Sequence, residues 1–372
     1  MPPKLRIAYI AHSLRSDWNN GNAHFLRGLM RSMTNLGHDI DVFEPEVGWS
    51  TENLRMEAEG RRSLTSFFSA YPDIRVKTFL TDGDPNSWKE HLVAKDVVIL
   101  HEWNEPELAQ HLLTLRDELG FRLVFHDTHH RASSSPGQIQ RFGLSHFDGV
   151  LAFGESLRSL YRGSFGISRC WTIHEAADVS IFHPYNNSIE TPQRDVVWIG
   201  NWGEGERSTE IGEFFLKPAA NLGSIADFTI YGVRYPSEAL CALNECGVRY
   251  GGYLPNLDAP RVYASASLTV HIPRQQYNSA IVGIPTIRVF EALACGIPLI
   301  SAPWVDSEKL FRPGDLKLVH NSTEATNAMR YLIQNPAAAA EQAQRGLETV
   351  LLRHTCDHRA EELTAICEEL LS

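Results

Sequence analysis

Short apolar segments alternate with helix-like segments along most of the chain, and this alternation constrains the fold more than any other feature of the sequence. A strand expected at residues 5–10 is followed by a polar loop, by apolar residues at helical spacing from Phe25 to Met33, and by a second strand at residues 37–43. Such a strand–helix–strand unit is almost always right-handed and makes its strands parallel. The first half of the chain therefore predicts one parallel sheet, with strands at residues 5–10, 37–43, 96–100, 121–125, 149–153 and 170–174.

A second alternation begins after residues 182–194, a segment with two prolines and no hydrophobic periodicity that we interpret as a linker. At 372 residues the chain exceeds what one hydrophobic core usually serves. We therefore expect two α/β domains, residues 1–187 and residues 188–372. The strands expected in the second lie at residues 195–199, 228–232, 248–253, 267–272, 298–301 and 316–319, with helices over residues 336–371. Residues 50–85 are less regular, and only an amphipathic stretch at residues 64–68 is assigned there.

The composition argues against several function classes. A formal net charge of −11 argues against a nucleic-acid partner. No apolar run approaches the ~18 residues of a membrane span, and the N-terminal residues lack a signal-peptide core. Because the six cysteines include no C-x-x-C pair, neither disulfides nor a zinc site is expected. We expect a cytoplasmic protein.

Residues 279–298 form the most informative stretch, because they predict a short helix with both ends marked. Pro285 suits the first helical position, while Gly296 and Pro298 are typical of a helix end. Helical spacing places Arg288, Glu291 and Cys295 on one face and the apolar residues on another. The free N–H groups of the first turn and Arg288 would bind a phosphate, and Glu291 could accept hydrogen bonds from a ribose diol.

The alternative is an exposed Arg288–Glu291 ion pair on an ordinary amphipathic helix. The neighbourhood favours the ligand. Between Asp258 and Asp306, Glu291 is the only acidic residue, whereas Arg261, Arg274 and Arg288 all lie in that window. A local basic pocket in an acidic protein indicates a small anionic ligand.

Other polar clusters follow predicted strands, where open parallel sheets bind their ligands. The glycine-rich turn at residues 200–207 lacks the G-x-G-x-x-G and G-x-x-x-x-G-K-[ST] patterns, so it is either a tight turn or a place of phosphate approach. The histidine-rich loop at residues 126–130 lacks a metal-binding pattern. Its side chains could contact substrate or carry a proton, or the loop could simply be solvated. Trp103, Trp198 and Trp202 could stack on sugar rings or fill the crevice walls.

These segments together resemble the bacterial group 1 glycosyltransferases, most closely the spore-maturation-protein-like branch. GIPTIRVFEALACGIP at residues 283–298 is similar to the donor-binding signature of that family. GNWG at residues 200–203, YGVRYP at 231–236 and GYLPN at 252–256 resemble the second domain of the branch, and residues 172–184 resemble the interdomain segment. The resemblance implies a GT-B fold, in which two Rossmann-like α/β domains face each other across a cleft and the final helix crosses back to the first domain.

The resemblance also implies site residues. Glu291 would hold the ribose, the amides of Thr286 and Ile287 with Arg274 and Arg288 would hold the diphosphate, and residues 253–256 would border the base. The full set of expected donor-binding residues is Gly200, Trp202, Gly203, Arg207, Tyr231, Arg234, Tyr253, Leu254, Arg274, Gly283, Ile284, Pro285, Thr286, Ile287, Arg288 and Glu291. His129 or His130 matches the active-site histidine of the family, with Asp127 as a further catalytic candidate. Gly283 stands where the family pattern has the first of two glutamates.

The expected function is transfer of a sugar, most simply a hexose, from a nucleotide-diphosphate sugar to an unknown acceptor. A UDP-sugar is the favoured donor, no metal or cofactor is expected, and the stereochemical outcome expected from the resemblance is retention. Two alternatives remain: a nucleotide-sugar binding protein without transferase activity, suggested by Gly283, and a nucleotide-sugar epimerase on the same fold. The sequence predicts neither the acceptor nor the oligomeric state.

Overall fold

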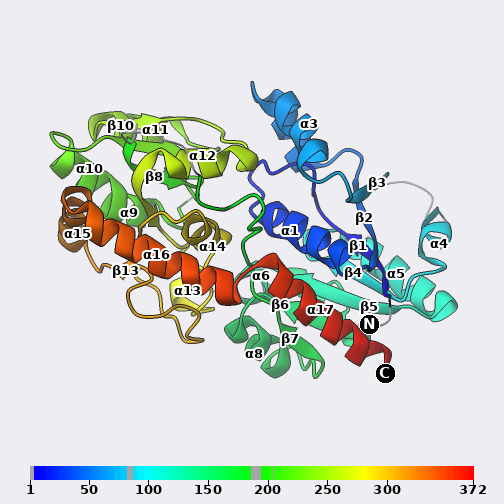
Figure 1. Cartoon of the computed structure of the whole chain (residues 1–372). Helices are drawn as coiled ribbons and strands as arrows, with labels where there is room; N and C mark the ends of the chain where they lie inside the picture. Colours follow the sequence, from blue (N-terminus) through cyan, green and yellow to red (C-terminus); the bar gives the residue numbers. More distant parts are fainter. Residues whose placement is uncertain (1–3, 82–86, 186–193, 204) are drawn as a thin grey trace. The chain divides into compact units, whose positions relative to one another are not determined.

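The computed structural model describes residues 4–81, 87–185, 194–203 and 205–372 (Figure 1). The chain forms two compact units. Unit 1 comprises Met1–Glu175 with Cys356–Ser372, and unit 2 comprises Ala176–Thr355. The expected domain boundary at residues 187/188, and most of the expected linker, lie outside the described residues.

Unit 1 is built on a parallel sheet of seven described strands in the order β3-β2-β1-β4-β5-β6-β7. Ile7 of the central strand β1 pairs with Ile40 of β2 on one side and Val97 of β4 on the other. The strands are β1 (Arg6–Ile10), β2 (Asp39–Pro45), β3 (Arg75–Phe79), β4 (Val97–His101), β5 (Arg122–Asp127), β6 (Gly149–Ala152) and β7 (Cys170–Thr172). Strands β1 and β4 to β6 are almost wholly buried, as expected for a parallel sheet covered on both faces.

Helices connect and cover these strands. They are α1 (Asn22–Asn35), α2 (Trp49–Met56), α3 (Gly60–Ala70), α4 (Ser87–Leu92), α5 (Pro106–Leu119), α6 (Arg131–Ser134), α7 (Pro136–Gln140) and α8 (Glu155–Gly163), with a 3₁₀ turn at Leu144–His146. The C-terminal helix α17 (Cys356–Leu371) also belongs to unit 1, where it packs against α1 (Figure 1). Ser32 of α1 donates a hydrogen bond to Asp357 (2.6 Å). The final helix therefore completes the first unit, although it follows the second in sequence.

Unit 2 repeats the architecture with six described strands in the order β10-β9-β8-β11-β12-β13. The strands are β8 (Arg194–Ile199), β9 (Phe228–Tyr231), β10 (Val248–Tyr250), β11 (Ala266–His271), β12 (Leu299–Ser301) and β13 (Lys317–Leu318). The helices are α9 (Ser208–Ile211), α10 (Lys217–Leu222), α11 (Ser237–Glu245), α12 (Ala259–Ala264), α13 (Gln276–Ser279), α14 (Ile287–Ala294), α15 (Ser322–Gln334) and α16 (Pro336–Arg353), with a π-helical turn at Gly212–Leu216 and a 3₁₀ turn at Asn256–Asp258.

Alternate residues of β8 face two different hydrophobic layers of unit 2. Val196 and Trp198 pack with the helices on one face of the sheet, whereas Val197 and Ile199 pack with α14 on the other. The period of two residues along a strand explains this division. Helix α14 thus lies in a core layer, against β11 and β12.

Two sequence-based expectations need correction. Strand β3 lies inside residues 50–85, where none was assigned, because its charged residues and partial exposure do not give the apolar pattern of a buried strand. The helix expected from Pro285 begins only at Ile287, since the backbone of Thr286 is extended (φ −81°, ψ 160°). Gly296 does follow its end, with φ +67°.

Candidate functional site

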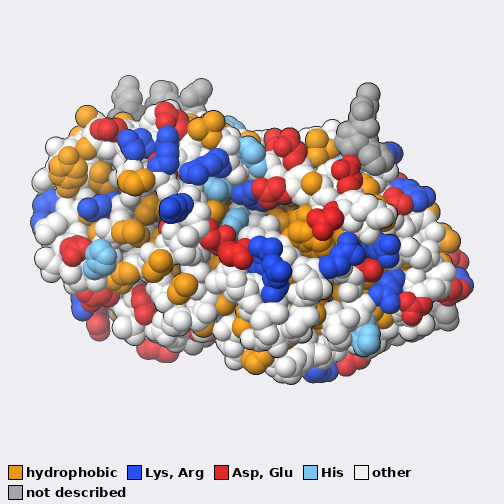
Figure 2. All heavy atoms as spheres, turned by 90° about the horizontal axis from the view of Figure 1, so that it is seen from below, with side chains coloured by type: hydrophobic (Ala, Val, Ile, Leu, Met, Phe, Trp, Pro, Cys, Tyr) orange, Lys and Arg blue, Asp and Glu red, His pale blue; other side chains and the backbone are white. Residues whose placement is uncertain are grey.

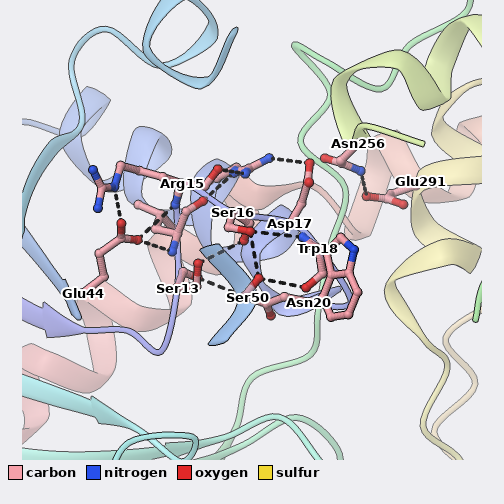
Figure 3. Close-up of polar contacts among 12 residues, drawn as sticks. Ser13, Arg15, Ser16, Asp17, Trp18, Asn20, Glu44, Ser50, Asn256 and Glu291 are labelled. Atoms are coloured by element: carbon pink, nitrogen blue, oxygen red, sulfur yellow. Dashed lines mark hydrogen bonds and ion pairs between the residues drawn. The ribbon is translucent and has the colours of Figure 1, made fainter. Parts of the chain in front are cut away.

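Glu291 is the central polar residue of the α14 region in unit 2. Its side chain is only 1% exposed. One carboxylate oxygen accepts a hydrogen bond from Asn256 Nδ2 (3.1 Å, Figure 3), and the other accepts one from Arg288 Nη1 (2.7 Å). Arg288 itself stays partly exposed. The Arg288–Glu291 pair of the sequence alternative therefore exists, but its carboxylate is buried, which requires compensation by partners of this kind.

The other residues expected on the ligand face of α14 do not share one environment. Cys295 is buried in the hydrophobic layer, so the division of the helix into a packing face and an open face is wrong. The N-terminus of the helix remains the polar end. The carbonyl of Thr286 is the first acceptor of the helix and bonds to Val289 N (3.0 Å). The amides of Thr286 and Ile287 come before Val289 and therefore lie ahead of the helical hydrogen-bond ladder.

The expected basic pocket is neutralised by an acid from outside the window that defined it. Glu206, in the turn after β8, accepts hydrogen bonds from Arg274 Nη1 and from Gln276 (3.1 Å). These contacts span 68 and 70 residues in sequence. Arg274 is therefore held as an ion pair and not as an isolated positive charge.

Arg207 stabilises the turn in which it lies. It donates to the backbone and side-chain oxygens of Asn201 and lies over the Trp198 ring at 5.2 Å. Burial, together with the nearby Arg274, lowers the pKa of Arg207 to about 10. Gly203 has a left-handed φ of +83°, and a Cβ there would lie 2.6 Å from Arg207 Cγ. The glycine therefore lets the arginine fold back on the turn.

Gly283, at the position of the missing glutamate, is constrained in the same way. Its φ is +93°, and a Cβ would lie 2.2 Å from the hydroxyl of Ser307. A glutamate could not adopt this backbone without strain and displacement of Ser307. The departure from the family pattern is thus built into the local conformation.

All sixteen expected donor-binding residues lie in unit 2, in or after the ends of strands, or at the start of α14. Those after β8 are Gly200, Trp202, Gly203 and Arg207. Tyr231 is the last residue of β9 and Arg234 follows it, Tyr253 and Leu254 follow β10, Arg274, Gly283, Ile284, Pro285 and Thr286 follow β11, and Ile287, Arg288 and Glu291 belong to α14. Ile284, Pro285 and Ile287 are buried, whereas Arg234 is exposed and has a left-handed φ of +61°. The carboxyl edge of one parallel sheet gathers the set, as open α/β sheets do for ligands.

In unit 1, the expected catalytic candidates occupy different environments. Asp127 is fully buried and accepts hydrogen bonds from the Tyr161 hydroxyl and from His129 N (2.9 Å). Burial raises the pKa of Asp127. His130 is buried, with Nδ1 2.8 Å from Ser134 Oγ. Of the three candidates, His129 alone is partly exposed.

Glu102, for which no role was predicted, holds this loop in place. It is fully buried and accepts two hydrogen bonds from Arg131 (2.9 and 3.1 Å) and one from Thr128 N (3.1 Å). Burial and the neighbouring Asp127 raise the pKa of Glu102 well above its usual range. Arg131 also lies 3.8 Å from the centre of the Trp103 ring. An acid directly after β4 was the available sequence signal.

A second network, also missed from sequence, holds the loop after β1 (Figure 3). Glu44, at the end of β2, accepts hydrogen bonds from Leu14 N (2.6 Å), Arg15 N (3.1 Å) and the Arg15 guanidinium. The buried Arg27 donates to the carbonyls of Leu14 (2.7 Å) and Arg15 (2.8 Å) and pairs with Asp17. Three buried charged side chains, those of Arg27, Asp17 and Glu44, thus fix the conformation of a loop that contains no secondary structure of its own.

Among the described residues, no group of three or more His, Cys, Asp or Glu side chains is arranged to hold a metal ion. No described helix is both long and apolar enough to span a membrane. On the face shown in Figure 2, acidic and basic side chains are interspersed and form no extended surface of one sign.

Comparisons with known proteins agree with this architecture. Residues 207–365 match the family described as glycosyl transferase-like. No curated protein sequence matches the chain.

Solved structures resemble the chain over nearly its whole length. Anabaena HepE in complex with UDP and glucose has a TM-score of 0.70 at 13% identity, covering 97% of this chain and 98% of that one. A glycosyltransferase from Rickettsia africae has a TM-score of 0.68 at 11% identity, covering 99% of each chain. An alpha-glucosyltransferase in complex with UDP and a 13-mer DNA has a TM-score of 0.70 at 11% identity, covering 98% of this chain and all (100%) of that one.

The predicted GT-B fold is confirmed, and so is the predicted class of enzyme, a glycosyltransferase. The spore-maturation-protein-like branch stays a prediction.

Proposed function

We propose that the chain transfers a sugar from a UDP-sugar to an acceptor, with the donor on unit 2 and the acceptor on unit 1. The observation that carries this proposal is the buried Glu291 beside the N-terminal turn of α14, held by Asn256 and Arg288. It lies inside the segment that matches the glycosyl transferase-like family. The choice of base is supported by the structurally similar Anabaena HepE, whose solved complexes contain UDP and UDP-glucose.

Donor binding on unit 2 uses an exchange of partners. The diphosphate takes the amides of Thr286 and Ile287 and draws Arg274 and Arg288 away from their present carboxylate partners. Glu291, released from Arg288, accepts the ribose hydroxyls. The remaining expected residues line the loops around base and sugar, with Tyr253 and Leu254 at the base.

Catalysis then rests on electrostatics and positioning. The α14 N-terminus and the two arginines stabilise the negative charge that develops on the leaving diphosphate, so no metal ion is needed. His129 is the proposed proton carrier of unit 1, because Asp127 and His130 are buried and already engaged. The proposed outcome is retention of the anomeric configuration, which NMR of the product would establish.

A thermal-shift screen of the full chain over nucleotides and nucleotide sugars tests the donor proposal. A ligand at 100 times its dissociation constant stabilises the folded state by about 2.7 kcal/mol. UDP and at least one UDP-sugar are expected to give such a shift, and EDTA is expected to leave it and any transfer activity unchanged. No shift with any UDP compound, or activity that returns only with added Mn²⁺ or Mg²⁺, would contradict the proposal.

Gly283 favours a second candidate, a UDP-sugar binding protein without transferase activity. The left-handed backbone and the nearby Ser307 leave no room for a carboxylate side chain at this position. Slow release of free sugar from a bound donor, followed without added acceptor, distinguishes the two. Release supports the enzyme, whereas an intact donor after prolonged incubation, in every acceptor mixture tried, supports the binding protein.

A further inference from the structure

Two ring nitrogens in unit 2 are buried and have no hydrogen-bond partner among the described residues. They are Nε2 of His271 and Nε1 of Trp304. Their side chains are only 3% and 6% exposed. Since the large majority of buried polar side-chain atoms in proteins have a partner, two such atoms close together point to a polar ligand.

Ser301 determines which ring nitrogen of His271 carries the proton. Its hydroxyl donates to the carbonyl of Ala302 (2.8 Å), so its oxygen accepts the Nδ1–H of His271 at 2.9 Å. The proton on Nδ1 makes Nε2 an acceptor. Burial lowers the pKa of His271 to about 3, which keeps the ring neutral near pH 7. The indole nitrogen of Trp304 can only donate.

The two rings lie at the ligand-binding edge of the sheet. His271 is the last residue of β11 and pairs in register with Ser301, the last residue of β12, and Trp304 follows three residues later. The ring centres are 6.4 Å apart and nearly perpendicular (89°). The neighbouring carbonyl of Ile272 lies 3.4 Å from an Arg207 nitrogen, so the pair adjoins the arginine-bearing turn after β8.

An acceptor beside a donor suits a hydroxyl group, which can donate to His271 Nε2 and accept from Trp304 Nε1. A diphosphate oxygen suits the site poorly, because it could not donate to the histidine. We propose that His271 and Trp304 bind hydroxyl groups of the donor's sugar and thereby help to determine which sugar is accepted. This proposal rests on the proposed function, and it separates sugar recognition from the recognition of the nucleotide.

Isothermal titration of the full chain with UDP and with UDP-glucose tests the assignment. Trp304→Phe removes the donor but keeps a ring, and His271→Asn keeps a donor toward Ser301 but loses the acceptor at Nε2. Each variant is expected to weaken UDP-glucose binding roughly 5- to 30-fold, because a buried hydroxyl loses its partner, and to leave UDP affinity within about twofold. Trp88→Phe, which alters a buried indole in unit 1, is the matched control and should change neither.

Deoxy analogues of UDP-glucose test the same assignment on the unaltered chain. At least one analogue that lacks a single hydroxyl should bind roughly 5- to 30-fold more weakly than UDP-glucose. The proposal is overturned if all analogues bind alike, or if the two variants shift UDP and UDP-glucose equally or lose only thermal stability, as a structural water site would predict. If the unaltered chain binds neither UDP nor UDP-glucose, the proposed function is refuted instead.

Discussion

The charged networks of the two units differ in how closely the protein holds them. In unit 1, Arg27 and Asp17 are almost inaccessible, and Glu102 is fully buried under several hydrogen bonds. In unit 2, the side chains of Arg274 and Glu206 stay 26% and 29% exposed, and Arg288 is also open to solvent. A buried, fully satisfied charge fixes a backbone, whereas a partly exposed ion pair such as Arg274–Glu206 can exchange partners at low cost. The comparison indicates a rigid scaffold in unit 1, and in unit 2 it shows a more exposed ion pair of the kind that the proposed anion site requires.

Replacement of Arg27 gives the largest expected effect on stability. Arg27→Met leaves Asp17 and two loop carbonyls without their buried partner, so unit 1 should lose about 3–5 kcal/mol of its unfolding free energy. Native-state hydrogen exchange in β1 would measure the loss separately from unit 2. Arg55→Met, on an exposed helix of the same unit, is the control and should cost at most about 1 kcal/mol. A comparable loss in both variants would show that the Arg27 network is not a special anchor.

Mild acid should destabilise unit 2 through the buried ring of His271, whereas groups of opposite effect act in unit 1. Burial lowers the pKa of His126 and of His271 to about 3 and that of His101 well below its usual value. Because these folded-state values lie below the unfolded value of about 6.5, the unfolded chain binds more protons as the pH falls, and stability is lost.

The size of the acid effect follows from the groups whose pKa differs between the folded and the unfolded chain. Between pH 7.5 and pH 5.5, a histidine with a folded-state pKa of about 3 costs about 1.4 kcal/mol, which is the loss expected from His271 in unit 2 and from His126 in unit 1. In unit 1, Glu102 acts in the opposite sense, because its raised pKa lets the folded chain bind a proton before the unfolded chain does. Hydrogen exchange in β1 and β8 at the two pH values measures both losses. No loss in unit 2 would contradict the assignment of the His271 ring as neutral.

A side chain at position 283 should strain unit 2 locally. Gly283→Ala meets Ser307 at a left-handed φ and is expected to cost about 1–3 kcal/mol. Gly212→Ala is the control, because φ is −55° there and nothing lies within 4 Å of the added Cβ. Urea denaturation followed through the unit 2 transition compares them. A Gly283→Ala variant as stable as the control would remove the structural reason for the absent glutamate.

Replacement of Arg274 should have the smallest effect on stability. Arg274→Met breaks a partly exposed pair with Glu206, so the unfolding free energy should fall by at most about 1 kcal/mol. UDP affinity should nevertheless fall by roughly tenfold or more, because a charge-assisted contact to phosphate is lost. Calorimetry with UDP and a melting curve on the same variant give both quantities. A large loss of stability with unchanged UDP affinity would show that Arg274 has a structural role, like the buried charges of unit 1, and does not bind the diphosphate.

The sequence predicted most of the fold, because buried parallel strands are continuous apolar runs that are visible without tertiary information. It failed at β3, an edge strand with charged residues. In the candidate site, the Arg288–Glu291 pair was visible because its members are three residues apart on a helix. The Arg274–Glu206 pair was not, since its partners are 68 residues apart and meet only when β8 and β11 lie side by side. The burial of Asp127 was likewise hidden, because only the fold brings Tyr161 to its carboxylate.

UDP titration of the Glu291→Ala variant tests the central claim, that α14 presents Glu291 to a nucleotide. Loss of charge-assisted bonds to the ribose, worth roughly 1.5–3 kcal/mol, predicts UDP affinity about 10- to 150-fold below that of the unaltered chain. Glu238→Ala, at an exposed position in the first turn of α11, should bind UDP as the unaltered chain does. The account is contradicted if Glu291→Ala binds UDP with unchanged affinity and shows only lower stability, since Glu291 would then serve only as the buried partner of Arg288 and Asn256.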